Sequence, residues 1–104
     1  TTGDIVGCAV DMTNRKIYYH KNGTYINSGN PSSGSNGFDI SSSFDFVLPA
    51  ISMYESGTKG EVNFGNPSFS ISSGNADADG YGNFEYSVPS GFYALCTKNL
   101  AEYG

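Results

Sequence analysis

Residues 72–86, SSGNADADGYGNFEY, gather short oxygen-bearing side chains between glycines. Asp77, Asp79 and Gly80 read as D-x-D-G, a pattern typical of calcium loops, in which carboxylate and carbonyl oxygens coordinate the cation. Asn83 adds another oxygen nearby. The metal-site candidates are therefore Asp77, Asp79 and Asn83, and Ca²⁺ is the one cofactor that the residue types suggest.

A simpler interpretation needs no ion. In the register of an EF-hand the twelfth position requires a bidentate glutamate, but here it is Tyr86, and Glu85 stands one place early. The flanking residues do not have a helical pattern. Short Asn and Asp side chains also bind their own backbone in glycine-rich turns. The sequence therefore favours a solvated turn cluster, and we expect no bound metal or cofactor.

Catalytic chemistry has few candidates in this chain. His20 is the only histidine, so a Ser-His-Asp triad would depend on it, and no G-x-S-x-G motif is present. Glycoside hydrolysis needs two facing carboxyl groups. Glu61 and Glu85 are the glutamates best placed near expected strands, but no E-x-E or E-x-D pattern occurs. We expect that the protein is not an enzyme and has no catalytic residues.

Aromatic residues leave a carbohydrate-binding role open. Tyrosine faces stack on sugars, and the candidate surfaces are TYINSGN at 24–30 and YGNFEY at 81–86. The alternative is that Tyr and Phe fill the core of a chain that has eight Tyr, seven Phe and no Trp. The sequence favours the second interpretation.

Length and charge exclude several classes of protein. A chain of 104 residues makes one domain at most. Its formal net charge of −5 argues against nucleic-acid binding, which requires a cationic face. No apolar run approaches the roughly 20 residues of a membrane-spanning helix, so membrane insertion is not expected. The start, TTGDIVG, without Met or a signal peptide, suggests an internal piece of a longer protein or a processed form.

The two cysteines, Cys8 and Cys96, stand in apolar surroundings, VGCAV and YALCT. Two buried free thiols that behave as small hydrophobic residues are the simplest interpretation. One disulfide that joins the two ends of the chain is the alternative.

Short apolar runs separated by turns predict an all-β chain with long Gly/Ser/Asn loops. Asn22–Gly23 is a strong signal for a type I′ hairpin, and the polar residues 27–39 and 72–83 are expected loops. Pro49 marks a bulge, an edge or a break, because proline cannot donate to a ladder. No segment shows a 3.6-residue period. The expected strands cover residues 4–12, 16–21, 24–26, 44–48, 51–54, 61–65 and 91–100.

Four ordered blocks within residues 3–69 resemble the C-terminal half of a SPRY domain. That family has a G-D-x-I-G-x-x-x-D strand, a strand ending in K-N-G, a Pro-Ala-x-S strand and an N-F-G-x-x-P-F ending. The matching positions are Gly3, Asp4, Gly7, Asp11, Lys21, Asn22, Gly23, Pro49, Ala50, Ser52, Asn63, Phe64, Gly65, Pro67 and Phe69. Residues 70–104 add the acidic loop, a closing strand and a tail. The run GFYALCTKNL looks like the ending that follows SPRY-type modules in bacteriophage structural proteins.

The resemblance implies an antiparallel β-sandwich of SPRY or concanavalin-like type, with 1–104 forming one domain or the C-terminal part of one. It implies a non-enzymatic structural or interaction module, a component of a bacteriophage virion or a similar extracellular assembly. Its partners would be further copies or other virion subunits. The family's N-terminal half has no counterpart here, so half a sandwich would expose apolar faces and unpaired edges. The alternative is a monomeric binding module that recognises a peptide or a cell-surface glycan.

Overall fold

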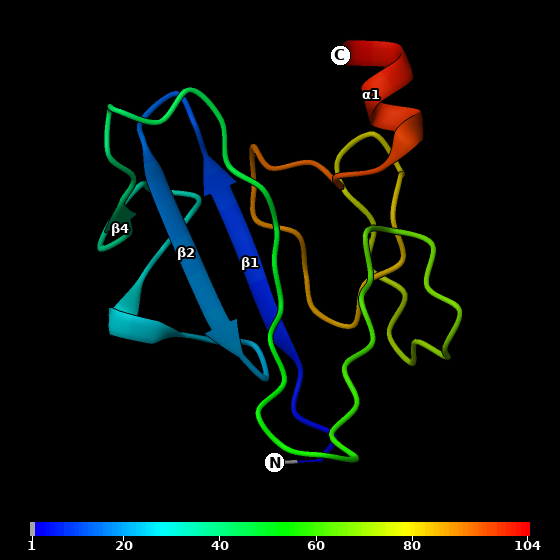
Figure 1. Ribbon diagram of the computed structural model, residues 1–104. Coiled ribbons are helices and arrows are strands. Elements are labelled where there is room, and N and C mark those ends of the chain that lie inside the picture. Colours follow the sequence, from blue (N-terminus) through cyan, green and yellow to red (C-terminus); the bar gives the residue numbers. More distant parts are fainter. Residues whose placement is uncertain (1) are drawn as a thin grey trace.

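The centre of the molecule is an antiparallel hairpin. The computed structural model describes residues 2–104. In it β1 (Val6–Asp11) pairs along its whole length with β2 (Lys16–Lys21) (Figure 1). The Asp11 carboxylate closes the connection by accepting hydrogen bonds from the backbone N–H (2.9 Å) and the side-chain amide (2.7 Å) of Asn14. Both strands lie where the sequence predicts them.

The second turn confirms the Asn-Gly signal. Asn22 and Gly23 both have positive φ, 50° and 84°, as a type I′ turn requires. The short strand β3 (Thr24–Tyr25) then pairs with the end of β2. The three strands predicted at 4–12, 16–21 and 24–26 are therefore confirmed and form an antiparallel meander, although the third strand is brief and leads into a 3₁₀ turn, η1 (Ile26–Ser28).

A fourth strand lies inside the predicted loop 27–39. Strand β4 (Phe38–Asp39) pairs with Lys16 and Ile17, on the edge of β2 that β3 also uses. Phe38 packs near Tyr19, with ring centroids 6.3 Å apart, and Asp39 forms an ion pair with Lys16. These side-chain contacts bring the loop's end back to the sheet. The prediction of a loop for the whole of 27–39 is therefore wrong at its last two residues.

The two faces of the sheet differ in burial. On the covered face, Tyr18 is only 2% exposed and Ala9 is also buried. The ring of Phe92 meets Tyr18 edge-on at 6.4 Å. The other face, called the open face from here on, turns hydrophobic residues towards solvent, because successive strand residues alternate in direction. The open face comprises Val6, Cys8, Val10, Ile17 and Tyr19.

Several predicted strands are absent from the described residues. Residues 44–48, 51–54 and 61–65 have an extended appearance in Figure 1 but join no ladder. A strand requires a partner for its backbone groups, and none lies in register with these segments. The regular structure is thus one antiparallel sheet of four strands and one short helix. The predicted second layer of the sandwich is not formed as a sheet within residues 2–104.

The closing strand predicted at 91–100 is also wrong: residues 91–96 join no ladder, and the last four residues of the range are helical. Helix α1 (Thr97–Tyr103) begins there and lies at the C-terminal end of the chain (Figure 1). Its residues Lys98, Leu100, Ala101 and Glu102 are strong helix formers. The expectation that no part of the chain is helical gave too little weight to this propensity.

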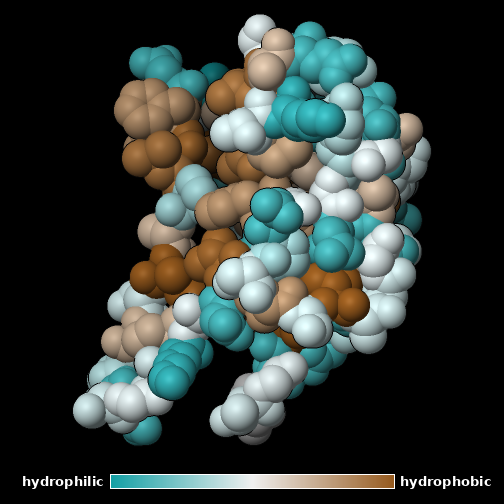
Figure 2. All heavy atoms as spheres, turned by 90° about the vertical axis from the view of Figure 1, so that its right-hand side faces the viewer, coloured by the Kyte–Doolittle hydropathy of each residue, from teal (hydrophilic) through white to brown (hydrophobic). Residues whose placement is uncertain are grey.

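The chain leaves much apolar surface in contact with solvent. Hydrophobic side chains are visible along the left side of the view in Figure 2. Leu48 is 78% exposed and Tyr54 is 99% exposed. They belong to residues 44–54, called the apolar segment from here on. Its exposed hydrophobic members are Phe44, Phe46, Val47, Leu48, Ile51, Met53 and Tyr54.

Candidate functional site

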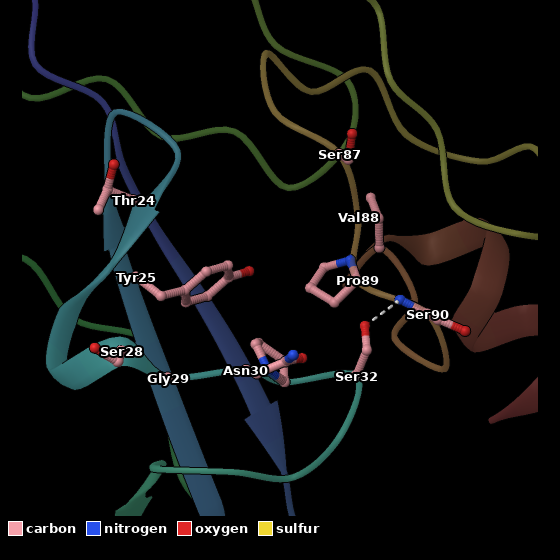
Figure 3. Close-up of a pocket in the computed structure, with 11 residues that line it drawn as sticks. Thr24, Tyr25, Ser28, Gly29, Asn30, Ser32, Ser87, Val88, Pro89 and Ser90 are labelled. Atoms are coloured by element: carbon pink, nitrogen blue, oxygen red, sulfur yellow. Dashed lines mark hydrogen bonds between the residues drawn. The ribbon is translucent and has the colours of Figure 1, made fainter.

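A groove lies between two loops on the covered side of the sheet. One wall comes from β3 and the loop that follows it, and the other comes from residues 87–90 (Figure 3). Its volume is about 700 Å³, which lies within the range of small-molecule sites. The lining residues are Thr24, Tyr25, Ser28, Gly29, Asn30, Pro31, Ser32, Ser87, Val88, Pro89 and Ser90.

Tyr25 is the one aromatic side chain that lines the groove. It stands opposite His20 in the ladder, and the two rings meet edge-on at 5.3 Å. His20 in turn meets Tyr86 in the same way, also at 5.3 Å. Figure 3 shows the Tyr25 ring extending from β3 towards Pro89. A row of three rings therefore fixes the direction of Tyr25.

Hydrogen bonds hold the two walls in place. The hydroxyl of Ser32 accepts a hydrogen bond from the backbone N–H of Ser90 at 3.0 Å, which joins residues 58 positions apart (Figure 3). Asn30 and Ser35 exchange two backbone hydrogen bonds, of 2.8 and 3.1 Å. On the opposite wall, the N–H of Phe92 binds the carbonyl of Pro89 at 3.0 Å. These bonds define the shape of the groove before any ligand arrives.

The lining carries no formal charge at neutral pH. It includes no Asp, Glu, Lys, Arg or His, and Tyr25 is its one ionisable group. Burial is the main cause that raises the pKa of Tyr25, so its phenol stays protonated at neutral pH. General acid–base catalysis needs a group that titrates near the working pH. The lining can therefore bind a ligand through hydrogen bonds and ring contacts, and it offers no such catalyst.

Sequence reasoning identified one wall of the groove and missed the other. The candidate sugar surface at 24–30 lies in the groove, whereas 81–86 does not line it, because Tyr86 packs against His20 instead. The second wall, SVPS at 87–90, was not singled out. Its proline turn is a signal for a loop, but nothing in its residue types shows that it lies across from β3.

The acidic loop is organised around Asp77, which is only 7% exposed. One carboxylate oxygen accepts hydrogen bonds from the backbone N–H groups of Asp79 (3.0 Å) and Tyr81 (2.9 Å). The other accepts from the backbone N–H of Ala94 (2.9 Å) and from the side-chain amide of Asn99 (2.7 Å). Asp77 thus joins its own loop to the segment that leads into α1.

These contacts determine the ionisation of Asp77. Burial alone would raise the pKa of this carboxyl group, but the four donors outweigh it and hold the pKa below its usual value. Each oxygen already accepts two hydrogen bonds, so a cation would have to displace N–H donors in order to bind. Of the other candidates, Asp79 is exposed, and the backbone carbonyl of Asn83 accepts a 2.8 Å bond from Asn63.

The remaining chemical candidates are dispersed. The Glu85 carboxylate accepts hydrogen bonds from the backbone and hydroxyl of Ser72, and Glu61 is exposed. His20 lies on the covered face, where burial lowers its pKa. Cys8 and Cys96 are free thiols, which contradicts the disulfide alternative. Cys8 is exposed and Cys96 is only half-buried, so the expectation of two buried thiols is wrong for Cys8 and is met only in part by Cys96.

Comparisons with known proteins add no relationship: no family model matches the chain, and no curated protein or solved structure is significantly similar to it. Among residues 2–104, no helix has the length and apolar character that crossing a membrane requires.

Proposed function

We propose that this chain is a non-enzymatic structural module whose exposed apolar surface is covered by neighbouring subunits in an assembly such as a bacteriophage virion. The observation that carries this proposal is the size of the surface. The accessible area is 7671 Å² for a mass of 11.0 kDa. A folded monomer of that mass is expected to expose about 5,600 Å².

The difference, about 2,000 Å², exceeds the roughly 800 Å² that each partner contributes to a standard protein interface. The radius of gyration supports the same reasoning. It is 14.2 Å, whereas about 13 Å is typical of a compact domain of this length. Large exposed apolar patches mark interaction surfaces in soluble proteins. The apolar segment and the open face supply such a surface.

The resemblance to a SPRY domain suggests which architecture the assembly completes. In this proposal the hairpin is part of a β-sandwich, and its second layer is completed by another chain or by assembly contacts. Strand β1 pairs on one side only among the described residues, so its other edge can accept a strand. Further copies of the chain or other virion subunits are the proposed partners, and the virion or another extracellular assembly is the proposed location.

The test is the size of the native particle and the state of its surface. Light scattering coupled to gel filtration should find an oligomer, or else a folded monomer that binds the dye ANS, which reports exposed apolar surface. Leu48→Asp should reduce the oligomer's mass or the dye binding, because it places a charge in the apolar segment. A folded monomer that binds no dye would overturn the proposal.

Thr58→Asp is the matched control. It adds the same charge at an exposed polar position near the apolar segment. The assembly and the dye binding should persist in this variant. If both substitutions had equal effects, the cause would be net charge and not the apolar surface.

A further inference from the structure

We propose that the groove between residues 24–32 and 87–90 is a binding site for an uncharged saccharide. This inference adds to the assembly role and does not depend on it. Tyr25 continues the covered face of the sheet, because it stands opposite His20. The groove and the open face therefore lie on opposite sides of the sheet.

Because the lining is uncharged, it favours an uncharged ligand. No lining residue carries a formal charge, so a phosphate, a carboxylate or an ammonium group would lose its hydration without gaining a charged partner. An apolar ligand would leave the hydroxyl groups of the lining without hydrogen bonds. A ligand with many hydroxyl groups and no charge meets both conditions.

The polar side chains suit a hydroxylated ligand in detail. A serine or threonine hydroxyl both donates and accepts, as does each hydroxyl of a sugar. The side-chain oxygen of Asn30 accepts a 3.2 Å hydrogen bond from the backbone N–H of Ser33, so its N–H₂ group is the part of the amide that can donate to a ligand hydroxyl. Residues that carry hydroxyl groups occur in both walls, and the Ser32 hydroxyl faces the opposite wall, where it accepts the hydrogen bond from the N–H of Ser90. They are Thr24, Ser28, Ser32, Ser87 and Ser90.

Tyr25 provides the apolar contact. The face of an aromatic ring is electron-rich and attracts the slightly positive C–H groups of a sugar. The edge-on contact with His20 holds this ring in position, and Pro89 stands across from it (Figure 3). A rigid ring reduces the entropy that binding would otherwise lose.

A peptide fits the groove less well. A peptide that binds by strand addition needs a long free edge, and β3 has only two residues. The six-residue strand β1 offers a longer edge elsewhere in the molecule. A peptide ligand is thus expected at β1 and not at the groove.

The experiment is a nuclear magnetic resonance titration of the full chain with four neutral disaccharides: lactose, maltose, cellobiose and mannobiose. At millimolar concentrations at least one should shift the amide signals of residues 24–32 and 87–90. Sialyllactose, which carries a carboxylate, should bind more weakly than lactose. Tyr25→Ala should weaken binding by about tenfold or more, equivalent to about 1.4 kcal/mol.

Two further variants keep the test decisive if Tyr25→Ala does not fold. Asn30→Asp places a charge in the groove and should weaken binding. Tyr54→Ala removes an exposed tyrosine outside the groove and should leave binding unchanged. The proposal is overturned if none of the four disaccharides shifts these signals, if sialyllactose binds as well as lactose, or if an unstructured polyglycine–serine peptide shifts the same amides equally.

Discussion

At the scale of single residues, Asp77 is the most constrained polar side chain. It was considered first as a metal ligand, because its residue type and spacing fit a calcium loop. In the structure it accepts four hydrogen bonds from two parts of the chain. Buried polar groups stabilise a fold only when they are paired in this way. Asp77 therefore has a structural role, which is to hold its loop against residues 94–99.

Asp77→Asn tests that role. The amide has one accepting oxygen and would direct its own N–H₂ at N–H donors, so the free energy of unfolding should fall by about 2–3 kcal/mol. The matched change Asp79→Asn, at an exposed carboxylate, should stay within about 0.5 kcal/mol. Urea denaturation measures both. Equal stabilities of the two variants would contradict the role of Asp77.

His20 makes stability depend on pH in a direction that the structure fixes. Burial lowers the pKa of His20 below the usual value of 6.5, so the folded state binds a proton less readily than the unfolded chain. Its Nδ1 also accepts a 3.2 Å hydrogen bond from the backbone of Gly23, which a proton on that atom would remove. The contribution of neutral His20 to the free energy of unfolding is therefore fully present above about pH 6.5. It is lost as the pH falls below that value.

This dependence is measurable because His20 is the only histidine. The urea midpoint of the native protein should fall between about pH 7 and pH 5. In His20→Gln, which stays neutral, most of that slope should disappear whatever its absolute stability. A slope that is unchanged in the variant would show that carboxyl groups cause it.

At the scale of elements, the turn between β2 and β3 is set by backbone geometry and by a tertiary contact together. Gly23 has a φ of 84°, which L side chains rarely adopt. A Cβ atom at this position would also lie 2.8 Å from the ring of Tyr86. The backbone at Gly23 therefore lies close against Tyr86, one of the three rings that position Tyr25.

Gly23→Ala and Gly34→Ala separate these two effects. Gly34 has a similar φ of 77°, but a Cβ there would meet nothing within 4 Å. We expect a loss of about 1 kcal/mol for Gly34→Ala and about 2–3 kcal/mol for Gly23→Ala. Equal losses, measured by urea denaturation, would mean that Tyr86 moves aside without cost.

At the scale of the whole molecule, the main feature is a small buried core beside a large exposed apolar surface. Ala9, Tyr18 and Ala94 are the buried hydrophobic residues of the described part of the chain. Marginal stability is normal for small domains, but so small a core leaves little to oppose the loss of chain entropy. We therefore expect that association contributes a large part of the stability.

Thermal unfolding at several protein concentrations tests this expectation. If copies of the chain associate, the melting temperature should rise with concentration, because each tenfold increase adds about 1.4 kcal/mol for a dimer. Phe46→Asp should make the midpoint lower and independent of concentration. A native midpoint that does not change with concentration would contradict self-association and leave other virion subunits as the proposed partners.

Local sequence alone specifies the hairpin of β1 and β2 and the Asn-Gly turn between β2 and β3. These features depend on neighbouring residues, because β-branched and aromatic side chains favour strands and a type I′ turn needs residues that accept positive φ. Local chemistry was sufficient for each of these predictions.

The remainder of the fold depends on contacts between residues that are distant in the sequence. Residues 44–54 have the composition of strands but lack a partner ladder, and Thr97–Tyr103 forms a helix at the end of a run that was expected to be extended. The hydrogen bond from Ser90 to Ser32 places residues 87–90 opposite β3. No local pattern encodes that contact, because the two residues meet only after the whole chain has folded.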